Sequence, residues 1–334
     1  MTMRAVVHTK FGPPEVLHLA EIPRPVPGPG DVLVRVHSTT VNRTDCGLRS
    51  ATPWIARFFT GWLRPRQPVL GTEFAGVVEA VGVDVTGFAP GDRVFGVNAN
   101  DMGAHAEYLC LPERAPIARM PDDLSFDEAA AVSDGMVLGL MLLRSAEVGP
   151  GSRIVVYGAS GSIGTAAVQL AKVLGAHVTA VVDTKHVDLA HDLGADEVID
   201  RLTTDFTRLG RRWDAIIDSV GKLTFWHCRS SLVARGTYVS SDLGPLWQNP
   251  VLALVSPRAG GRHMHFPIPH YRKSDVEWFR ELLERGEYRA VIDRHYALDD
   301  ILEATRYVET AQKTGNVVIR VIEPAEAGEP DAPA

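Results

Sequence analysis

The stretch Arg153-Ile-Val-Val-Tyr-Gly-Ala-Ser-Gly-Ser-Ile-Gly-Thr165 decides the fold of this chain. A short β-branched strand runs directly into Gly158, Gly161 and Gly164, and a helix-forming segment, Thr165–Leu174, follows. Glycines let the main chain turn tightly and approach a ligand closely, and a helix N-terminus carries partial positive charge. The sequence therefore predicts a loop that holds a pyrophosphate.

The surroundings of this loop decide how it is interpreted, because a glycine-rich loop alone is weak evidence. Ala159 occupies the first glycine position of the common G-x-G-x-x-G pattern. After the helix, Gly175 is a candidate C-cap, and His177–Val182 has the composition of a second buried strand. Asp183 follows about 20 residues after the last glycine, where an acidic residue meets the adenosine ribose. This context favours a dinucleotide loop over a turn without a ligand.

Strands and helices continue to alternate after Asp183. We predict helices over residues 187–193 and 228–232 and strands over residues 197–199, 213–220 and 237–241. Strands that alternate with helices indicate an α/β fold with a doubly wound parallel sheet.

The chain before residue 125 has a different pattern, with short strands separated by proline and glycine. The predicted strands cover residues 3–8, 31–41, 74–81 and 92–97. They indicate a compact, strongly bent β-domain. Past the nucleotide-binding block we predict helices over residues 274–285 and 299–308 and a strand over 316–321, which we expect to rejoin the N-terminal domain. The last residues, 324–334, hold only proline, alanine, glycine and acidic residues, and a disordered tail is expected.

Composition excludes several classes of function. A chain of 334 residues forms two domains, and its net charge of −7 argues against nucleic acid or an anionic membrane as its partner. Ala129–Leu143 is apolar but too short to span a bilayer, and no signal peptide precedes the first strand. Three widely spaced cysteines indicate a reducing compartment. We predict a cytoplasmic protein with a small-molecule substrate.

Motifs along most of the chain carry a resemblance to a known superfamily. They are Val41-Asn-Arg-Thr-Asp45, Gly71-Thr-Glu-Phe-Ala-Gly-Val-Val-Glu-Ala-Val-Gly82, Pro90-Gly-Asp-Arg-Val-Phe-Gly96, Gly158–Lys172, Gly194-Ala-Asp-Glu-Val-Ile-Asp200 and Lys313-Thr-Gly-Asn-Val-Val-Ile319. The chain resembles the zinc-free medium-chain dehydrogenases/reductases, close to the quinone oxidoreductases. The match is specific for the superfamily and does not specify a substrate.

The resemblance implies a domain organisation. It implies a GroES-like β-barrel catalytic domain over residues 1–125, completed by about 270–323, and a Rossmann dinucleotide-binding domain over residues 126–269. The cofactor is then expected in the cleft between the domains. The resemblance also implies a homodimer, in which the strand Gly261–Phe266 extends the sheet across a twofold axis.

The residues at the family's catalytic zinc positions make a poor metal site. The histidine of the usual Gly-His-Glu triplet is Thr72, the first cysteine is Asn42, and the third ligand falls near Asp134. Soft thiolates and the imidazole are therefore missing. Cys46 stands four positions beyond the ligand position, and we interpret it as a buried thiol. His263-Met264-His265 puts two imidazoles on one face of a strand without a third ligand, so we predict no metal.

Without a Lewis acid, hydride delivery to an electrophilic acceptor is easier than alcohol oxidation. Quinones and α,β-unsaturated carbonyls accept hydride and leave an anion that a hydrogen-bond donor stabilises. Since the resemblance puts the Asn42-Arg-Thr-Asp45 loop beside the nicotinamide, we predict catalytic roles for Asn42, Thr44 and Asp45. Two alternatives remain open: loop stabilisation by these side chains, and catalysis by hydrophobic enclosure of the acceptor.

The segment between the catalytic loop and Gly71 is rich in aromatic residues. Trp54, Phe58 and Trp62 suit a flat quinone or enone, so we predict that they bind substrate together with Thr72. An amphipathic helix packed on the barrel is the alternative.

The predicted cofactor residues lie in the loop, at the strand ends and in the C-terminal motif. They are Gly158, Ser160, Gly161, Ser162, Ile163, Gly164, Asp183, Thr184, Lys185, Arg201, Val220 and Asn316. Asp183 favours NAD, because it accepts from the ribose diol and repels a 2′-phosphate. Lys185 and Arg201 favour NADP, and the resemblance does so too, so NADP is predicted with NAD as the alternative.

The sequence thus predicts an NAD(P)H-dependent oxidoreductase that reduces a quinone or an α,β-unsaturated carbonyl. A zinc-independent alcohol dehydrogenase or an enoyl-thioester reductase of polyketide-type metabolism is the alternative enzyme. An enoyl-thioester reductase would need a cationic mouth, for which Arg64, Arg66 and Arg262 are candidates. The non-enzyme alternative is a cofactor-binding structural or regulatory protein.

Overall fold

The structure of the protein is a computed structural model that describes residues 1–52, 57–244, 247–256 and 261–322. It divides into two compact units. Unit 1 holds residues 1–130, 294–312 and those from 317 onward, and unit 2 holds residues 131–293 and 313–316. Trp54 and the predicted tail at 324–334 lie outside the described residues.

Unit 2 is built on a six-stranded parallel sheet in the order β10-β9-β8-β11-β12-β13. The strands are β8 (Arg153–Tyr157), β9 (His177–Val182), β10 (Glu197–Asp200), β11 (Trp213–Asp218), β12 (Leu232–Ser240) and β13 (His263–His265). The helices are α4 (Ser133–Ser145), α5 (Ser162–Val173), α6 (Val187–Asp192), α7 (Phe225–Cys228), α8 (Gln248–Val255) and α9 (Lys273–Glu284). This alternation confirms the predicted doubly wound α/β fold.

The parallel sheet forms because its strands are apolar on both faces. Ile154, Val155 and Val156 of the central strand β8 are fully buried. Val155 belongs to a core that also contains Trp213 and Tyr238 of the neighbouring strands. The sheet order reverses direction at β8, where the chain leaves the strand for the glycine loop, and ligands of such sheets bind at this kind of position.

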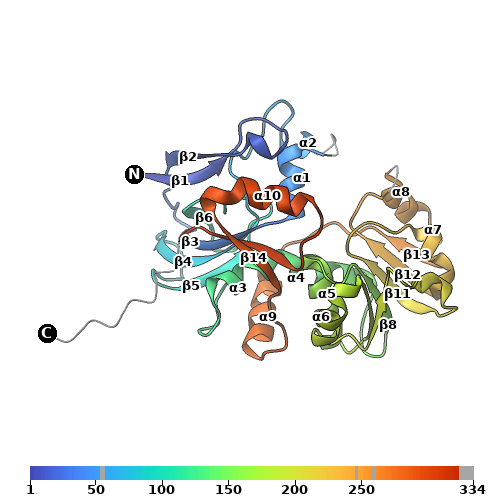
Figure 1. Ribbon diagram of the computed structural model, residues 1–334. Coiled ribbons are helices and arrows are strands. Elements are labelled where there is room, and N and C mark those ends of the chain that lie inside the picture. The colour runs from blue at the N-terminus through green and yellow to red at the C-terminus, as the bar shows by residue number, and fades with distance from the viewer. Residues whose placement is uncertain (53–56, 245–246, 257–260, 323–334) are drawn as a thin grey trace. The chain divides into compact units, whose positions relative to one another are not determined.

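Unit 1 is mainly antiparallel, with a two-stranded sheet β1-β2 and a seven-stranded sheet in the order β14-β15-β3-β4-β5-β7, in which β6 also pairs with β3. Its strands are β1 (Thr2–Val7), β2 (His18–Pro23), β3 (Asp31–Val41), β4 (Glu73–Val81), β5 (Arg93–Val97), β6 (Tyr108–Pro112), β7 (Ile117–Arg119), β14 (Ile292–Ala297) and β15 (Asn316–Arg320). Its helices are α1 (Arg43–Ser50), α2 (Arg57–Thr60), α3 (Phe126–Ala130) and α10 (Ile301–Glu309). The red C-terminal elements of Figure 1 thus lie among the blue N-terminal ones, since β15 pairs with β3.

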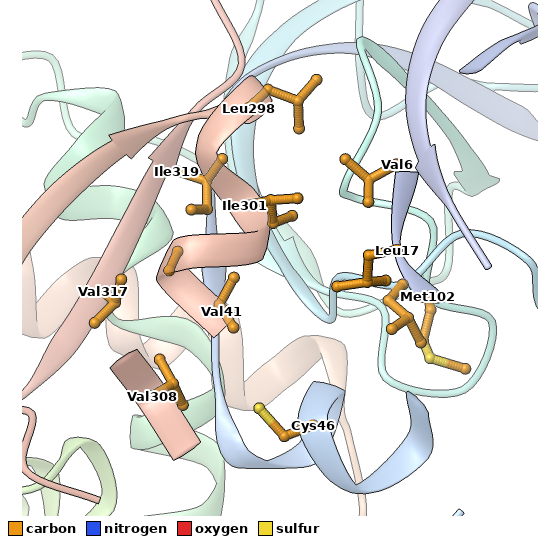
Figure 2. Close-up of a cluster of buried hydrophobic side chains, with 12 residues drawn as sticks. Val6, Leu17, Val41, Cys46, Met102, Leu298, Ile301, Val308, Val317 and Ile319 are labelled. Atoms are coloured by element: carbon orange, nitrogen blue, oxygen red, sulfur yellow. The ribbon is translucent and has the colours of Figure 1, made fainter. Parts of the chain in front are cut away.

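A buried apolar cluster joins the two ends of the chain within unit 1. Ile301 and Val308 of α10 pack with Val6 of β1, Val41 of β3 and Cys46 of α1 (Figure 2). Cys46 is 6% exposed, in agreement with a structural thiol, and burial raises its pKa to about 12. The cluster holds the loop between β3 and α1 in place, and that loop carries the predicted catalytic residues.

Several predicted elements differ from the observed ones at their ends: the helix predicted from Thr165 already begins at Ser162, and the strand predicted over 237–241 already begins at Leu232. The strand predicted to reach Val220 stops at Asp218, because the buried Asp218 carboxylate accepts the N–H groups of Val220, Gly221 and Leu223 and so turns the chain. The helix predicted over 228–232 begins earlier, at Phe225, because the Thr224 hydroxyl caps it. Residue 232 already belongs to β12.

The helix predicted to start at Asp299 also differs. Residues 298–300 form a 3₁₀ turn, α10 begins at Ile301, and no acidic side chain caps it. Among the described residues, no helix combines the length and apolar character needed to cross a membrane.

Candidate functional site

The glycine loop of unit 2 forms a cradle at the N-terminus of α5. Gly158 has a φ of +77°, and Gly161 is the N-cap of α5 without a side-chain cap. A Cβ at Gly164 would lie 2.1 Å from the Gly158 carbonyl oxygen, whereas a Cβ at Gly161 would meet nothing closer than 3.8 Å. Gly164 therefore permits close packing, and Gly161 leaves room for a ligand. Gly161 forms an isolated parallel bridge with Gly315, and no side chain caps the first turn of α5. The N–H groups of Ile163 and Gly164 in this turn are therefore available to an anion.

Two residues of the C-terminal motif, Gly315 and Asn316, form hydrogen bonds that stabilise this loop and the segments around it. The Gly315 N–H donates to the Ser160 carbonyl (2.8 Å). The Asn316 amide donates to the carbonyls of Ala131 (2.6 Å) and Val291 (3.2 Å), and Asn316 is 4% exposed. The predicted cofactor residue Asn316 thus holds backbone segments together. Ser160, Ser162 and Ile163 are half-buried around the cradle.

The predicted ribose site lies at the ends of β9 and β10. Asp183 forms an ion pair with Arg201, and the Thr184 hydroxyl donates to Asp200 (2.5 Å). Lys185 is exposed. The Arg201 cation therefore offsets the Asp183 charge that would repel a 2′-phosphate.

Two residues that the sequence analysis missed shape the loop that carries Val220. Asp218 is 1% exposed and also accepts from the Tyr238 hydroxyl (2.8 Å), and burial raises its pKa. The Ser219 hydroxyl donates to the Tyr157 carbonyl (2.7 Å). Val220 is half-exposed and lies over Gly158, where any Cβ would contact it at 2.5 Å. The sequence signal that could have indicated this loop is the acidic residue directly before Ser219-Val220-Gly221.

This combination fits a nicotinamide dinucleotide. An uncapped helix N-terminus faces open space at Gly161, a strand end offers Asp183 and Arg201, and an apolar side chain lies beside the loop. The residues present would hold the pyrophosphate by backbone N–H groups and the ribose by side chains.

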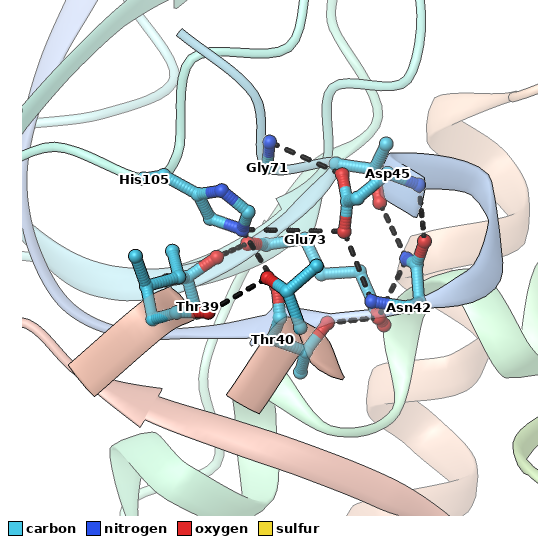
Figure 3. Close-up of polar contacts among 10 residues, drawn as sticks. Thr39, Thr40, Asn42, Asp45, Gly71, Glu73 and His105 are labelled. Carbon is cyan, nitrogen blue, oxygen red and sulfur yellow. Dashed lines mark hydrogen bonds and ion pairs between the residues drawn. The ribbon is translucent and has the colours of Figure 1, made fainter. Parts of the chain in front are cut away.

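The predicted catalytic loop of unit 1 carries a buried polar network (Figure 3). Asn42 caps α1: its Oδ1 accepts the Asp45 N–H (3.0 Å), and Asp45 Oδ2 accepts the Asn42 N–H (3.0 Å). Asp45 Oδ1 also accepts the Gly71 N–H (3.2 Å). Asp45 therefore joins the loop before α1 to the loop before β4 and does not face solvent.

The amide nitrogen of Asn42 is engaged as well. It donates to the Thr72 hydroxyl (2.7 Å) and, more weakly, towards Glu73 Oε1 (3.4 Å). Glu73, which the sequence analysis did not select, is fully buried and accepts the Thr40 hydroxyl (2.5 Å). Asn42 and Thr72 thus hold each other, and both are buried.

Thr44 differs from these neighbours. It lies in the first turn of α1, is half-buried, and its hydroxyl forms no hydrogen bond within the described residues. Of the predicted catalytic residues, Thr44 is the one whose side-chain donor is available to a ligand.

The donor set does not fit a catalytic zinc. Asn42 and Thr72 supply amide and hydroxyl groups where thiolate and imidazole are needed, and these groups bind one another. No group of histidine, cysteine and acidic side chains with metal-site geometry occurs in the described part of the chain.

His105 completes the network beside Asp45. Its Nε2 donates to the Thr40 carbonyl (2.9 Å) and lies 4.0 Å from Asp45 Oδ2. Burial lowers the pKa of His105 to about 4, so the ring is neutral at pH 7. Burial raises the pKa of Asp45 to about 7, although the N–H donors of Asn42 and Gly71 act against this rise.

The Asp45→Asn variant is expected to change how stability depends on pH. Because the folded pKa of Asp45 lies above the unfolded value of about 3.9, its ionisation destabilises the fold progressively from about pH 4 to pH 7, by about 4 kcal/mol in total. Asparagine does not ionise. The free energy of unfolding of the Asp45→Asn variant should therefore fall less across that pH range than that of the wild-type protein. Denaturant unfolding at several pH values measures the difference, and parallel profiles would contradict the assignment.

A pocket of about 360 Å³ lies elsewhere in unit 1, and its lining includes one residue of α1 and one of α2. Its lining includes Phe11, Leu48, Leu70, Met102 and Arg66. The rings of the predicted substrate residues Phe58 and Trp62 are 5.0 Å apart, and neither residue is among those that line this pocket. Trp54, the third predicted aromatic residue, lies outside the described residues.

Comparisons with known proteins agree with both units. Residues 28–122 match the family model of the alcohol dehydrogenase GroES-like domain, and residues 193–319 match that of a zinc-binding dehydrogenase. A quinone oxidoreductase of Pseudomonas aeruginosa is 30% identical over 92% of this chain and 97% of its own length. Trans-enoyl reductase pgmF of Aspergillus terreus is 30% identical over 89% and 88% of the two chains.

A solved structure of a quinone oxidoreductase also has the same fold. The quinone oxidoreductase from Coxiella burnetii superposes with a TM-score of 0.85 at 26% identity, covering 96% of this chain and all of that one. The chain belongs to the medium-chain dehydrogenase/reductase superfamily, among its quinone oxidoreductase-like members. It is an NAD(P)-dependent oxidoreductase, which confirms the predicted family and class of enzyme.

Proposed function

We propose that the protein reduces a quinone or an α,β-unsaturated carbonyl at the expense of NADPH and without a catalytic metal. The observation that carries the proposal is the hydrogen-bonded pair of Asn42 and Thr72 at the family's zinc positions, beside the available hydroxyl of Thr44. The bound dinucleotide supplies the hydride. An acceptor that is already electrophilic needs no Lewis acid, only a donor for the anion that forms.

Each predicted residue has a distinct proposed role. Thr44 donates its hydroxyl hydrogen bond to the acceptor oxygen as negative charge develops there. Asn42 and Asp45 hold the first turn of α1, and with it Thr44, in position. Phe58, whose ring lies 5.0 Å from that of the more exposed Trp62, covers a flat acceptor, and Thr72 fixes the Asn42 amide. Water then supplies the proton that completes the reduction.

The test follows oxidation of NADPH and NADH by absorbance, with chelator-treated protein and with an ortho-quinone, a para-quinone and a simple enone. We expect turnover that survives chelation. Activity that disappears on chelation and returns with Zn²⁺ would overturn the metal-free reaction. Absence of turnover with every acceptor, by protein that still binds dinucleotide, would overturn the acceptor class.

An enoyl thioester is the second candidate acceptor, because a trans-enoyl reductase is among the relatives with 30% identity. Its conjugated carbon accepts hydride in the same way, and its thioester oxygen would take the Thr44 hydrogen bond. Adding an enoyl-CoA to the set of tested acceptors distinguishes the two candidate acceptor classes. A kcat/KM for the enoyl-CoA far above that for the quinones would favour the thioester.

The proposed preference for NADPH rests on the Asp183–Arg201 ion pair and on the exposed Lys185. The Arg201→Ala variant should lower the ratio of kcat/KM for NADPH over NADH by about 10- to 100-fold, the value of one hydrogen bond to a charged group. The substitution removes the Arg201 cation, and the Asp183 carboxylate, now without its partner, repels the 2′-phosphate of NADPH. Arg211→Ala is the matched control, since Arg211 is exposed and pairs with Glu197 of β10. An unchanged ratio in Arg201→Ala would contradict the proposal.

A cytoplasmic homodimer is also proposed. Cys46, Cys110 and Cys228 are free thiols, as a reducing compartment would keep them. The strand β13 ends the parallel sheet, and the adjoining α8 exposes Val251 and Leu254. An edge strand beside an exposed apolar face suits pairing with a second copy. A monomer by light scattering at working concentration would contradict the dimer.

A further inference from the structure

The segment around α2 has a charge opposite to that of the whole chain. Between Asp45 and Glu73 the sequence contains no acidic residue, although the protein has 41 of them and a net charge of −7. The same stretch includes Arg57, Arg64 and Arg66. All three side chains are exposed, and none forms an ion pair within the described residues. This segment is therefore cationic, and the acidic residue that lines a pocket together with it is Asp101, near Arg66.

The chain after α2, light blue in Figure 1, forms a turn closed by backbone hydrogen bonds. The Arg66 N–H donates to the Thr60 carbonyl (2.8 Å), and the Gly61 N–H donates to the Arg57 carbonyl (3.0 Å). Gly61 has a φ of +120°, and a Cβ there would lie 2.1 Å from the Arg64 carbonyl oxygen. The turn therefore requires glycine at this position.

The turn presents large apolar side chains to solvent. Trp62 is 58% exposed and Leu63 is 83% exposed. They are followed directly by the exposed Arg64. Adjacent exposed apolar residues rimmed by cations mark an interaction surface. An indole beside an aliphatic side chain, with arginines around them, is the composition that lies at a bilayer interface.

We propose that the 57–66 turn docks the protein onto an anionic phospholipid surface, with Trp62 and Leu63 entering the interface and Arg57, Arg64 and Arg66 against the headgroup phosphates. A protein partner would need a broad contact of about 800 Å² on each side, whereas the described part of this turn exposes only three large apolar side chains, those of Phe58, Trp62 and Leu63. The whole-chain charge predicts no membrane partner, and the proposal departs from that prediction on the local charge. It does not depend on the acceptor proposed above.

The test is co-sedimentation of the full chain with vesicles of phosphatidylcholine, with and without phosphatidylglycerol, at increasing salt. We expect binding only to the anionic vesicles, weakening as salt rises. Leu63→Ser and Arg64→Gln should each lower the partition coefficient about fivefold, as expected for about 1 kcal/mol each. Gly61→Ala, which keeps every charge and apolar group, should also weaken binding, because it disrupts the turn.

Matched controls come from the same unit. Val83 is 91% exposed and lies next to Asp84, and Arg114 is exposed, so Val83→Ser and Arg114→Gln should bind like the wild type. Leu63→Ser should also keep wild-type turnover of a water-soluble acceptor, which separates docking from catalysis. Absence of binding to anionic vesicles, or equal binding by Leu63→Ser and the wild type, would overturn the proposal. Binding of an acidic carrier protein by this turn, without binding to vesicles, would also overturn the proposal.

Discussion

Replacing Thr44 by valine is expected to lower kcat for reduction of a quinone by about 100- to 1000-fold, the usual effect of removing one donor to a developing oxyanion. The hydroxyl of Thr44 is half-buried and forms no hydrogen bond within the described residues, so no structural contact is lost. Valine keeps the shape of the side chain. The KM for the dinucleotide should therefore stay close to that of the wild type, and steady-state kinetics measure both quantities.

Two further variants separate chemistry from structure at this loop. Thr44→Ser restores a hydroxyl and should recover most of the lost kcat. Asn42→Ala should lower the free energy of unfolding by about 1 kcal/mol or more, because Asn42 caps α1 and holds Thr72. A Thr44→Val protein with wild-type kcat would favour the rival explanation, in which hydrophobic enclosure alone activates the acceptor.

The nucleotide-binding fold could be predicted from the sequence because its signals are local. The glycines of the loop, the β-branched strand before it and the glycines after α5 and α6 each specify a backbone conformation within a few residues. Gly175 and Gly194 indeed have φ values of +80° and +93°. A buried parallel strand is likewise apolar throughout.

The site could be predicted only in part, because side-chain roles depend on distant contacts. The catalytic loop was found from its motif, but nothing in that motif indicates that the Asn42 amide is already engaged by Thr72, thirty residues later in the chain. Asp218 and Glu73 were missed for the same reason. Each is an acidic residue at the end of a strand, and only tertiary packing makes it a buried acceptor.

The Gly164→Ala variant is expected to lose both stability and dinucleotide binding. Its Cβ would lie 2.1 Å from the Gly158 carbonyl oxygen and 2.7 Å from the Ala159 Cα, and both are backbone atoms that cannot move aside cheaply. Overpacking of this kind destabilises a fold by about 1–3 kcal/mol or more. Helix α5 must move away from the glycine loop, and its N-terminal N–H groups then no longer point at the pyrophosphate. Denaturant unfolding and dinucleotide titration measure the two losses.

Gly161→Ala is the matched control, because it adds the same methyl group three residues earlier. Its Cβ meets no protein atom closer than 3.8 Å, and the φ of −81° suits alanine. Stability should therefore change by about 0.5 kcal/mol or less. Dinucleotide affinity should still fall by about tenfold or more, since the methyl group occupies the space through which the pyrophosphate approaches the backbone. If Gly161→Ala binds dinucleotide as tightly as the wild type, the open side of this loop does not hold the pyrophosphate.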